Sequence, residues 1–294
     1  LRNDGIKIPI LVLNPEISGY PQMIKYGLEP QIYNFRTLQK FTEALQSNTL
    51  SDEPFPIHIK LNTGMNRLGF EPSEMKKLGK LLADNPNVSV VSVFSHLSGS
   101  DEARFDAFTA QQFETFVAAA KVLEKQLDHP FLRHILNSNG ILRHPEYQLD
   151  MVRLGIALYG VSSHTESQKK LKPVSRLKTT ISQIRKVETG QQVGYSPKEK
   201  LKATRTIAVL TIGYADGYPR LLGNGVGRVY INGKYAQTVG NICMDMCMVD
   251  VSEIDCVEGD SAEVFGEHVS IYEVAKKLKT IPYEVLTNIS QRVK

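Results

Sequence analysis

Four short polar stretches of the 294-residue chain contain the side chains best suited to acid–base chemistry or anion binding. The first, residues 60–69 (KLNTGMNRLG), places Arg67 in a loop bounded by glycines. The second, residues 94–97 (FSHL), places His96 directly after an apolar run. On pattern alone, Arg67 could equally pair with a surface carboxylate, and a lone histidine is more often structural than catalytic.

The third polar stretch combines residues 136–140 (LNSNG) with residues 151–160 (MVRLGIALYG). Asn137 and Ser138, at a predicted strand end, could donate hydrogen bonds to an anion, and Gly155 would let a backbone N–H approach a phosphate closely. Two ordinary turns would give the same pattern.

The fourth set of polar residues lies in the second half of the chain. Residues 193–196 (VGYS) expose Tyr195 beside a glycine, while residues 213–220 (GYADGYPR) and 241–245 (NICMD) form polar turns next to apolar runs. A loop tyrosine is usually only a rim contact, so these residues have little meaning one at a time.

The first half of the chain alternates strand and helix patterns. Apolar runs predict strands at residues 8–13, 57–61 and 88–94, and helical spacing predicts helices at residues 73–83 and 109–127. The helix at 73–83 is expected to use Ser73 as its N-cap and to gather on one side Met75, Leu78, Leu81 and Leu82. This alternation predicts parallel βα units, and in a parallel barrel the carboxyl ends of the strands face the active site.

The second half reads as mostly antiparallel β structure. Strands are predicted at residues 176–188, 205–212, 227–231, 235–239 and 247–251, with a hairpin turn at Asn232–Gly233 and a final helix pair at residues 271–279 and 283–289. We therefore predict an α/β domain over residues 1–171 and a β domain over residues 172–294.

Composition and charge narrow the classes of function. Thirty-five Lys and Arg residues against 31 Asp and Glu leave a net charge of +4, too balanced for a nucleic-acid binder, and no apolar run approaches the roughly 20 residues that span a membrane. The three cysteines, Cys243, Cys247 and Cys256, lack zinc-site spacing and are expected to be free thiols in a reducing cytoplasm. No metal site is predicted.

Taken together and in order, seven stretches resemble the alanine racemase family of fold-type III pyridoxal-phosphate enzymes. They are KLNTGMNRLG, SHLSGS, LNSNG, DMVRLGIALYG, VGYS, IGYADGYPR and GNICMDMCMVD, and the resemblance extends from Pro9 to Arg292. It implies a TIM-type α/β barrel followed by a β domain. It also implies a cytoplasmic homodimer that racemises alanine for cell-wall synthesis. Each active site takes its pyridoxal 5′-phosphate from one barrel and its second base from the partner's β domain.

The resemblance also assigns roles to individual residues of the first half. Arg67 matches the arginine that bonds the cofactor's phenolic oxygen and neighbours the substrate carboxylate, His96 the histidine that stacks on the ring, and Arg153 the arginine that faces the pyridine nitrogen. Lys60 matches a lysine that is often carbamylated. The region that holds the phosphate and orients Arg153 matches Asn137, Ser138, Gly155 and Ile156.

In the second half, Tyr195 matches the family's tyrosine base. Met244 and Asp245 match the partner-subunit loop at the substrate, and Tyr214 matches the substrate entryway. The resemblance thus assigns catalysis to Tyr195, Arg67 and Asp245. Racemisation needs two bases on opposite faces of Cα, and a tyrosine serves as one only where its environment stabilises the phenolate.

The chain departs from the family pattern at several positions. The motif with the cofactor lysine, of the lysine-alanine-asparagine-alanine-tyrosine-glycine type, does not occur, and the first strand, first helix and second strand are expected to be missing. A phosphate-binding tyrosine would lie in that segment. Gln291 replaces a second such tyrosine, and Asn62 stands where many members have Asp. These 294 residues by themselves are therefore expected to be inactive.

Three other interpretations stay open. A decarboxylase of the same fold would place an acid at the pyridine nitrogen, and Arg153 argues against it. A racemase of another small amino acid such as serine is poorly distinguished, because one hydroxyl in a small pocket is weakly rejected. A non-catalytic binding module of the same fold would explain the absent lysine, but not the joint presence of Tyr195, Arg67 and Arg153.

Overall fold

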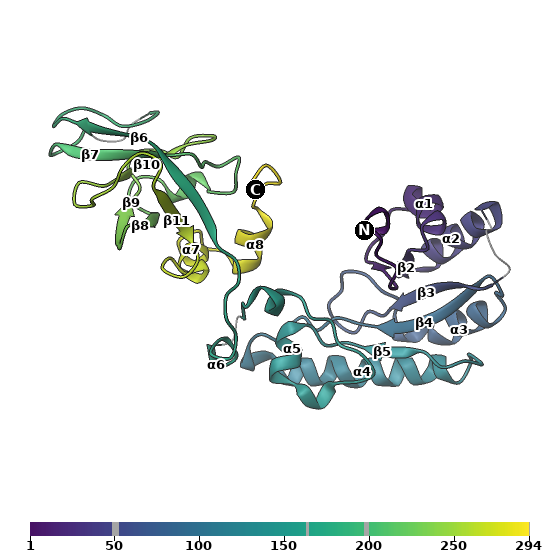
Figure 1. Ribbon diagram of the computed structural model, residues 1–294. Helices are drawn as coiled ribbons and strands as arrows, with labels where there is room; N and C mark the ends of the chain where they lie inside the picture. Colours follow the sequence, from purple (N-terminus) through teal and green to yellow (C-terminus); the bar gives the residue numbers. More distant parts are fainter. Residues whose placement is uncertain (49–52, 163–164, 197–199, 294) are drawn as a thin grey trace. The chain divides into compact units, whose positions relative to one another are not determined.

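The computed structural model describes residues 1–48, 53–162, 165–196 and 200–293 (Figure 1). The chain divides into two compact units, which we describe separately. The first comprises residues 1–158 and 162–170, and the second comprises residues 159–161 and 171–294. None of the described helices is long and apolar enough to cross a membrane.

The first unit is built on a parallel sheet whose strands follow one another in chain order. The strands are β1 (Leu11–Val12), β2 (Glu29–Ile32), β3 (Phe55–Lys60), β4 (Val88–Phe94) and β5 (Leu132–His134), arranged β1-β2-β3-β4-β5. This sequential parallel order is that of the wall of a βα barrel, which confirms the predicted fold class. Because all strands run the same way, their carboxyl ends meet at one edge.

Helices connect these strands. The α-helices are α1 (Tyr20–Lys25), α2 (Phe35–Asn48), α3 (Met75–Ala83), α4 (Asp106–Glu124), α5 (Ser138–Arg143) and α6 (Thr165–Gln168). Short 3-10 turns lie at η1 (Arg2–Asp4), η2 (Ile17–Gly19), η3 (Pro72–Glu74), η4 (Ala103–Phe105), η5 (Pro145–Tyr147) and η6 (Ile156–Tyr159). Residues from α1 to α4 pack with β2, β3 and β4 in one apolar core.

The predicted start and apolar face of α3 need correction. Ser73 is not the N-cap, because Glu71 and Glu74 form a reciprocal capping box around η3 just before the helix. Leu81 is 43% exposed, whereas Met75, Leu78 and Leu82 are buried. The helical rotation of about 100° per residue places Leu81 at the edge of that face rather than on it.

Side chains alternate between the two faces of β3. Ile57 and Ile59 belong to the apolar core that includes the helices, so His58 and Lys60 point to the opposite face. Both are buried all the same. The sheet therefore has a polar inner layer facing away from the helices.

The second unit contains a mostly antiparallel sheet and a helix pair. Its strands are β6 (Leu177–Val187), β7 (Arg205–Leu210), β8 (Arg228–Ile231), β9 (Lys234–Gln237), β10 (Cys247–Asp250) and β11 (Ser261–Phe265), in the order β10-β7-β6-β11-β8-β9. The other elements are η7 (Arg220–Leu222), α7 (Ile271–Lys277) and α8 (Pro282–Thr287). Asn232 and Gly233 have φ values of 43° and 90° and join β8 to β9, which confirms the predicted hairpin.

We predict that Leu78→Ala lowers the free energy of unfolding by about 2 to 5 kcal/mol, because it empties a fully buried site in the core. Leu81→Ala is the matched control on the same helix. Its loss should stay below about 1 kcal/mol, because the side chain is already largely in water. Denaturant unfolding of both variants measures the difference, and equal losses would contradict the placement of the two leucines.

Candidate active site

The loop after β3 carries Arg67 and is closed by backbone hydrogen bonds. Asn62 N donates to Phe70 O at 2.9 Å, and Phe70 N donates to Lys60 O at 2.9 Å. Gly69, with φ of 131°, lies so close that a Cβ there would be 2.4 Å from Asn62 N. Glycine is therefore required at this position, and the closed loop holds Arg67 exposed at its tip.

Asn62 organises the inside of this loop through both ends of its amide. Its Oδ1 accepts from Asn66 N at 2.9 Å and Gly64 N at 3.3 Å. Its Nδ2 donates to Glu71 Oε1 at 2.7 Å and Asn66 Oδ1 at 2.9 Å. An aspartate could not donate to Glu71, so the neighbouring carboxylate gives a physical reason for asparagine at this point in the chain.

Lys60 ends β3 below the loop and is buried. Removal from water, together with the nearby charges of Arg153 and Arg67, lowers the pKa of its amine to about 7. Its Nζ lies 5.1 Å from the centre of the Phe94 ring. The amine is therefore partly neutral at pH 7, which makes it unusually nucleophilic for a lysine.

Arg153 lies across the carboxyl ends of β4 and β5. Its Nη2 donates to Ser95 O at 2.6 Å and to Ile135 O at 3.2 Å, and its Nη1 contacts Nδ1 of His134. Burial lowers the pKa of Arg153 to about 10, which still leaves it protonated at pH 7. Among the described residues its Nε has no hydrogen-bond partner.

A purely structural role for Arg153 would pair it with a nearby carboxylate such as Asp150. The structure pairs Asp150 instead with Arg133, at 3.0 Å. Within the described part of the chain, Arg153, Lys60 and Arg67 make no ion pair at all. We call these three side chains the cation cluster.

His96 adds a neutral ring to the cation cluster. Burial and the positive charges of Arg153, Lys60 and Arg67 lower the pKa of His96 to about 4. The imidazole is therefore uncharged at pH 7. Arg153 Nη2 lies 3.4 Å from its Nδ1.

Ser138 lies at the start of α5 and approaches the segment that follows Arg153. Its Oγ accepts from Gly155 N at 2.8 Å and from Ala157 N at 3.3 Å. Because both lone pairs are used, the hydroxyl hydrogen is left to donate outward. A Cβ on Gly155 would meet nothing closer than Ser138 Oγ at 3.6 Å, so the space beside this exposed backbone is open.

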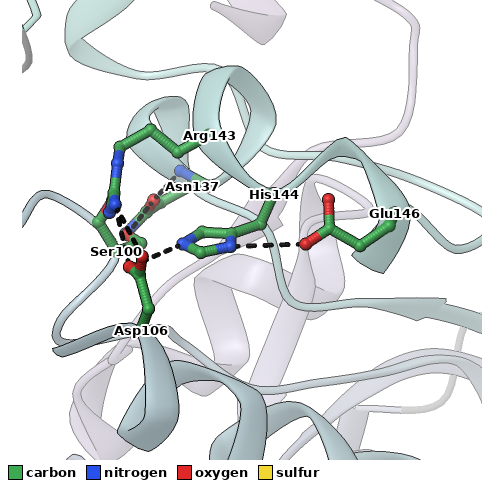
Figure 2. Close-up of polar contacts among 7 residues, drawn as sticks. Ser100, Asp106, Asn137, Arg143, His144 and Glu146 are labelled. Carbon is green, nitrogen blue, oxygen red and sulfur yellow. Dashed lines mark hydrogen bonds and ion pairs between the residues drawn. The ribbon is translucent and has the colours of Figure 1, made fainter. Parts of the chain in front are cut away.

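Asn137 positions α5 rather than presenting a free side chain (Figure 2). Its Oδ1 accepts from Ser100 Oγ and from Gly140 N, each at 2.9 Å, and its Nδ2 donates to Leu97 O at 3.0 Å. Through these bonds the start of α5 is joined to the loop after β4.

The other end of α5 is anchored by charged residues (Figure 2). Arg143 Nη2 bonds Asp106 Oδ1 at 2.8 Å, and Arg143 Nη1 donates to Ser100 O at 2.9 Å. His144 lies between Asp106, at 3.5 Å, and Glu146, at 3.4 Å. Both ends of α5 are thus fixed, and with them the position of Ser138.

The predicted site residues of the second unit lie on loops that are hydrogen-bonded to one another. Tyr214 N donates to Cys243 O at 3.0 Å, and Ala215 N donates to Met244 O at 2.9 Å. A Cβ on Gly213 would lie 2.4 Å from Cys243 O, so only glycine permits this approach. Asp245 is exposed at the same turn.

Tyr195 is held to these loops by Asn241, which begins the quoted NICMD stretch but was assigned no role there. Asn241 Nδ2 donates to Tyr195 O at 2.9 Å and to Ser196 O at 3.3 Å. The Tyr195 side chain is 74% exposed, and those of Met244 and Tyr214 are 57% and 48% exposed. The second unit therefore presents an unusually exposed set of large side chains on loops held by Asn241.

Gln291 lies near the end of the second unit, next to an anchored residue. Arg292 Nε pairs with Asp216 Oδ1 at 2.8 Å, and Asp216 Oδ2 accepts from Gly213 N at 2.9 Å. Asp216 is buried and thus ties the segment containing Gln291 to the Tyr214 loop. The sequence pointed to Asp216 only through its position in the GYADGYPR stretch.

The structure thus gathers the predicted residues into two groups, one in each unit. In the first unit it brings Lys60, Arg67, His96 and Arg153 together at the carboxyl ends of β3 to β5. Sequence reasoning missed Ser95 and His134, which hold Arg153. Ser95 lies within the quoted FSHL stretch, but His134 had no signal because its partner is 19 residues away.

Each of the two halves of the chain matches a known protein family model. Residues 1–163 match the family described as "Alanine racemase, N-terminal domain", and residues 174–294 match "Alanine racemase, C-terminal domain". The chain is 36% identical to an alanine racemase of Clostridium kluyveri, covering 100% of this chain and 76% of that protein.

Solved structures show the same similarity. An alanine racemase of Clostridium difficile 630 matches with a TM-score of 0.91 at 33% identity, covering 99% of this chain and 77% of that chain. An alanine racemase of Bartonella henselae, described with covalently bound pyridoxal phosphate, matches with a TM-score of 0.82 at 32% identity over 98% of this chain and 78% of that chain. With both domains matched along its length, the chain belongs to the alanine racemase family.

Proposed function

We propose that the chain racemises alanine with pyridoxal 5′-phosphate held at the cation cluster, for the synthesis of cell-wall peptidoglycan. The observation that carries this proposal is that buried Lys60 and half-buried Arg153 lie near exposed Arg67, with no carboxylate paired with any of them among the described residues. Such an arrangement favours an anionic ligand, because buried charges are normally paired. The cofactor's phosphate and phenolate and the substrate's carboxylate are all anions.

The residues present fit this cofactor. The outward hydroxyl of Ser138 and the open space beside Gly155 suit a phosphate, with Asn137 fixing α5 and Ile156 next in the same segment. His96 is neutral and so can stack on an aromatic ring without placing a further positive charge there. When bound, the cofactor supplies an electron sink that makes the substrate's Cα–H acidic.

Arg153 would face the ring nitrogen through its Nε–H. Both Nη atoms already have partners, so Nε is the donor that remains. Because the guanidinium keeps its proton at pH 7, it would hydrogen-bond the ring nitrogen without protonating it. This arrangement weakens the electron sink and discourages transamination. It also disfavours a decarboxylase, which needs an acid at this position.

We further propose that two copies of the chain share active sites. Tyr195, Met244 and Tyr214 are much more exposed than large side chains usually are, and they lie on loops held together by Asn241. In a homodimer these loops would reach the partner's cation cluster. Tyr195 would then exchange the Cα proton on one face, with Asp245 and Met244 beside the substrate and Arg67 holding its carboxylate.

Two alternatives to alanine racemisation can be distinguished by experiment. A serine racemase would use the same residues and differ only in its relative kcat/KM for serine and alanine. A non-catalytic binding module would bind cofactor but not exchange a Cα proton. We place the enzyme in the cytoplasm, in line with the unpaired state of Cys243, Cys247 and Cys256.

Residues 1–294 by themselves are expected not to racemise alanine, because none of their lysines stands in the family's cofactor-lysine motif. Mixing this polypeptide with pyridoxal 5′-phosphate and L-alanine and assaying D-alanine tests this expectation. Sustained turnover would show that a lysine of this chain, with Lys60 the first candidate, binds the cofactor.

In protein that racemises alanine, Tyr195→Phe should lower racemisation by about two to four orders of magnitude, because it removes one positioned base. Cofactor binding should persist, since Tyr195 is expected to come from the partner. Exchange of the Cα proton from each enantiomer in deuterated water measures the effect. Tyr26→Phe is the matched control, since Tyr26 is an exposed tyrosine of the first unit. Equal, undiminished exchange from both enantiomers would remove Tyr195 from the mechanism.

Lys60 is expected to form a carbamate, Lys-NH₂ + CO₂ → Lys-NH-COO⁻ + H⁺, whose negative charge would lie near Arg67. Only the neutral amine reacts, so the carbamate should grow as pH rises through about 7 and decline below it. Carbon-13 NMR with labelled bicarbonate detects the adduct. Lys60→Met should abolish the signal, and a signal that survives this change or is absent at high pH contradicts the assignment.

A further inference from the structure

A continuous line of buried polar groups runs across the inner layer of the sheet and ends at Arg153. Glu29 Oε2 lies 2.7 Å from His58 Nε2, and His58 Nδ1 lies 2.6 Å from Ser92 Oγ. Ser92 Oγ lies 2.9 Å from His134 Nε2, and His134 Nδ1 contacts Arg153 Nη1. One residue comes from each of β2, β3, β4 and β5. We call Glu29, His58, Ser92 and His134 the polar chain.

The direction of these hydrogen bonds is determined from the arginine end. Every N–H of a guanidinium is a donor, so His134 Nδ1 has to accept. Burial and the charge of Arg153 lower the pKa of His134 to about 3, so the ring is neutral and its hydrogen is on Nε2. That hydrogen is donated to Ser92.

The remaining links follow in turn. Ser92 is fully buried, and among the described residues His58 Nδ1 is the acceptor left for its hydroxyl hydrogen. Because Nδ1 of His58 accepts from Ser92, the ring carries its hydrogen on Nε2, and burial lowers the pKa of His58 in the same sense. His58 Nε2 then donates to the Glu29 carboxylate. All donors point toward Glu29, and each ring nitrogen of His58 and His134 has a partner.

Packing of the sheet alone does not require four polar side chains at these buried positions. Glu29, His58, Ser92 and His134 are each at most 9% exposed, in a sheet that could bury apolar side chains at these positions. The His134 ring is additionally fixed by stacking on Phe94, with centroids 4.8 Å apart and planes 5° apart. A ring held this firmly presents Nδ1 to Arg153 in a single direction.

We propose that Glu29, His58, Ser92 and His134 are positioning residues that hold the Arg153 guanidinium in one orientation and leave its Nε–H free for the cofactor's ring nitrogen. The Glu29 carboxylate, which can only accept, ends the line of oriented hydrogen bonds at His58. The orientation of Arg153 stands on the contacts in this chain, whereas its use at a ring nitrogen rests on the proposed function.

Histidine tautomers test the orientation without any cofactor. Nitrogen-15 NMR of labelled imidazoles should show both His58 and His134 neutral with the hydrogen on Nε2, between about pH 6.5 and 8. Arg153→Lys keeps an obligatory donor and should leave both tautomers in place. Arg153→Gln offers an amide oxygen and should let His134 populate the Nδ1–H form. A wild-type Nδ1–H tautomer, or no response to Arg153→Gln, would overturn the proposed direction.

Ligand binding tests the link to the ring nitrogen. Pyridoxine 5′-phosphate needs no lysine bond, and an analogue with C–H in place of the ring nitrogen differs from it only in that acceptor. The protein should bind the natural ring about tenfold more tightly, the size expected for a hydrogen bond from a charged donor. Ser92→Ala should reduce this preference to about twofold or less and leave affinity for the analogue unchanged, because only the Arg153 orientation is lost.

Matched variants separate positioning from folding. Ser92→Thr retains the hydroxyl and should restore the preference, and Ser89→Ala on the same strand should not alter it. Glu29→Gln keeps an acceptor for His58 and should keep the preference, whereas Glu29→Met should lose it. Equal weakening toward both ligands would assign the polar chain a purely structural role and overturn the proposal. Absence of binding to either ligand by the wild type would instead contradict the proposed function, with the tautomers still deciding the orientation.

Discussion

The burial of positive charge without a paired carboxylate is the constraint on which the rest of the first unit depends. Arg153 is held by the carbonyls of Ser95 and Ile135 and by a neutral imidazole, none of which cancels its charge. Lys60 is buried nearby, with its pKa lowered to about 7 by desolvation and by its cationic neighbours. A folded protein sustains such an arrangement where an anion will bind. Under the proposed function, this arrangement would select an anionic ligand.

The loop after β3 and the helix α5, which surround the cation cluster, are held in place by their own hydrogen bonds. Asn62 and Gly69 close the loop that carries Arg67, while Asn137 and Arg143 hold the two ends of α5. A site of this kind needs groups fixed to within a fraction of an ångström, which parallel strands provide and loops do not. Loops become adequate only when their own side chains close them, as Asn62 does.

In the second unit the candidate side chains of Tyr195, Met244 and Tyr214 are exposed rather than buried. Gly213 allows two loops to approach within backbone contact, and Asn241 bonds the loop of Tyr195 to them. Asp216 joins the same assembly to the segment that contains Gln291. The exposed tyrosines are therefore positioned by rigid backbone contacts rather than by burial of their own rings.

The sequence by itself determined the class of fold, the strand β4, the hairpin at Asn232–Gly233 and the identity of the residues that form the cation cluster. These features depend on local patterns, namely runs of β-branched residues, turn residues that accept positive φ, and ordered motifs. It did not identify β2, whose residues Glu29–Ile32 read as polar although all four are buried. Nor could it assign Leu81 to solvent, because the edge of a helical face depends on what packs against it.

Only the tertiary structure decided how Arg153 is held and what Glu29 does. Glu29, His58, Ser92 and His134 are separated by 29 to 42 residues from one to the next, and each looks ordinary in its own strand. They meet because parallel strands in sequential order place one inward side chain from each strand beside the next. Hydrogen-bond direction then follows from the guanidinium, which can only donate. No local pattern carries that information, because it arises from the register between strands.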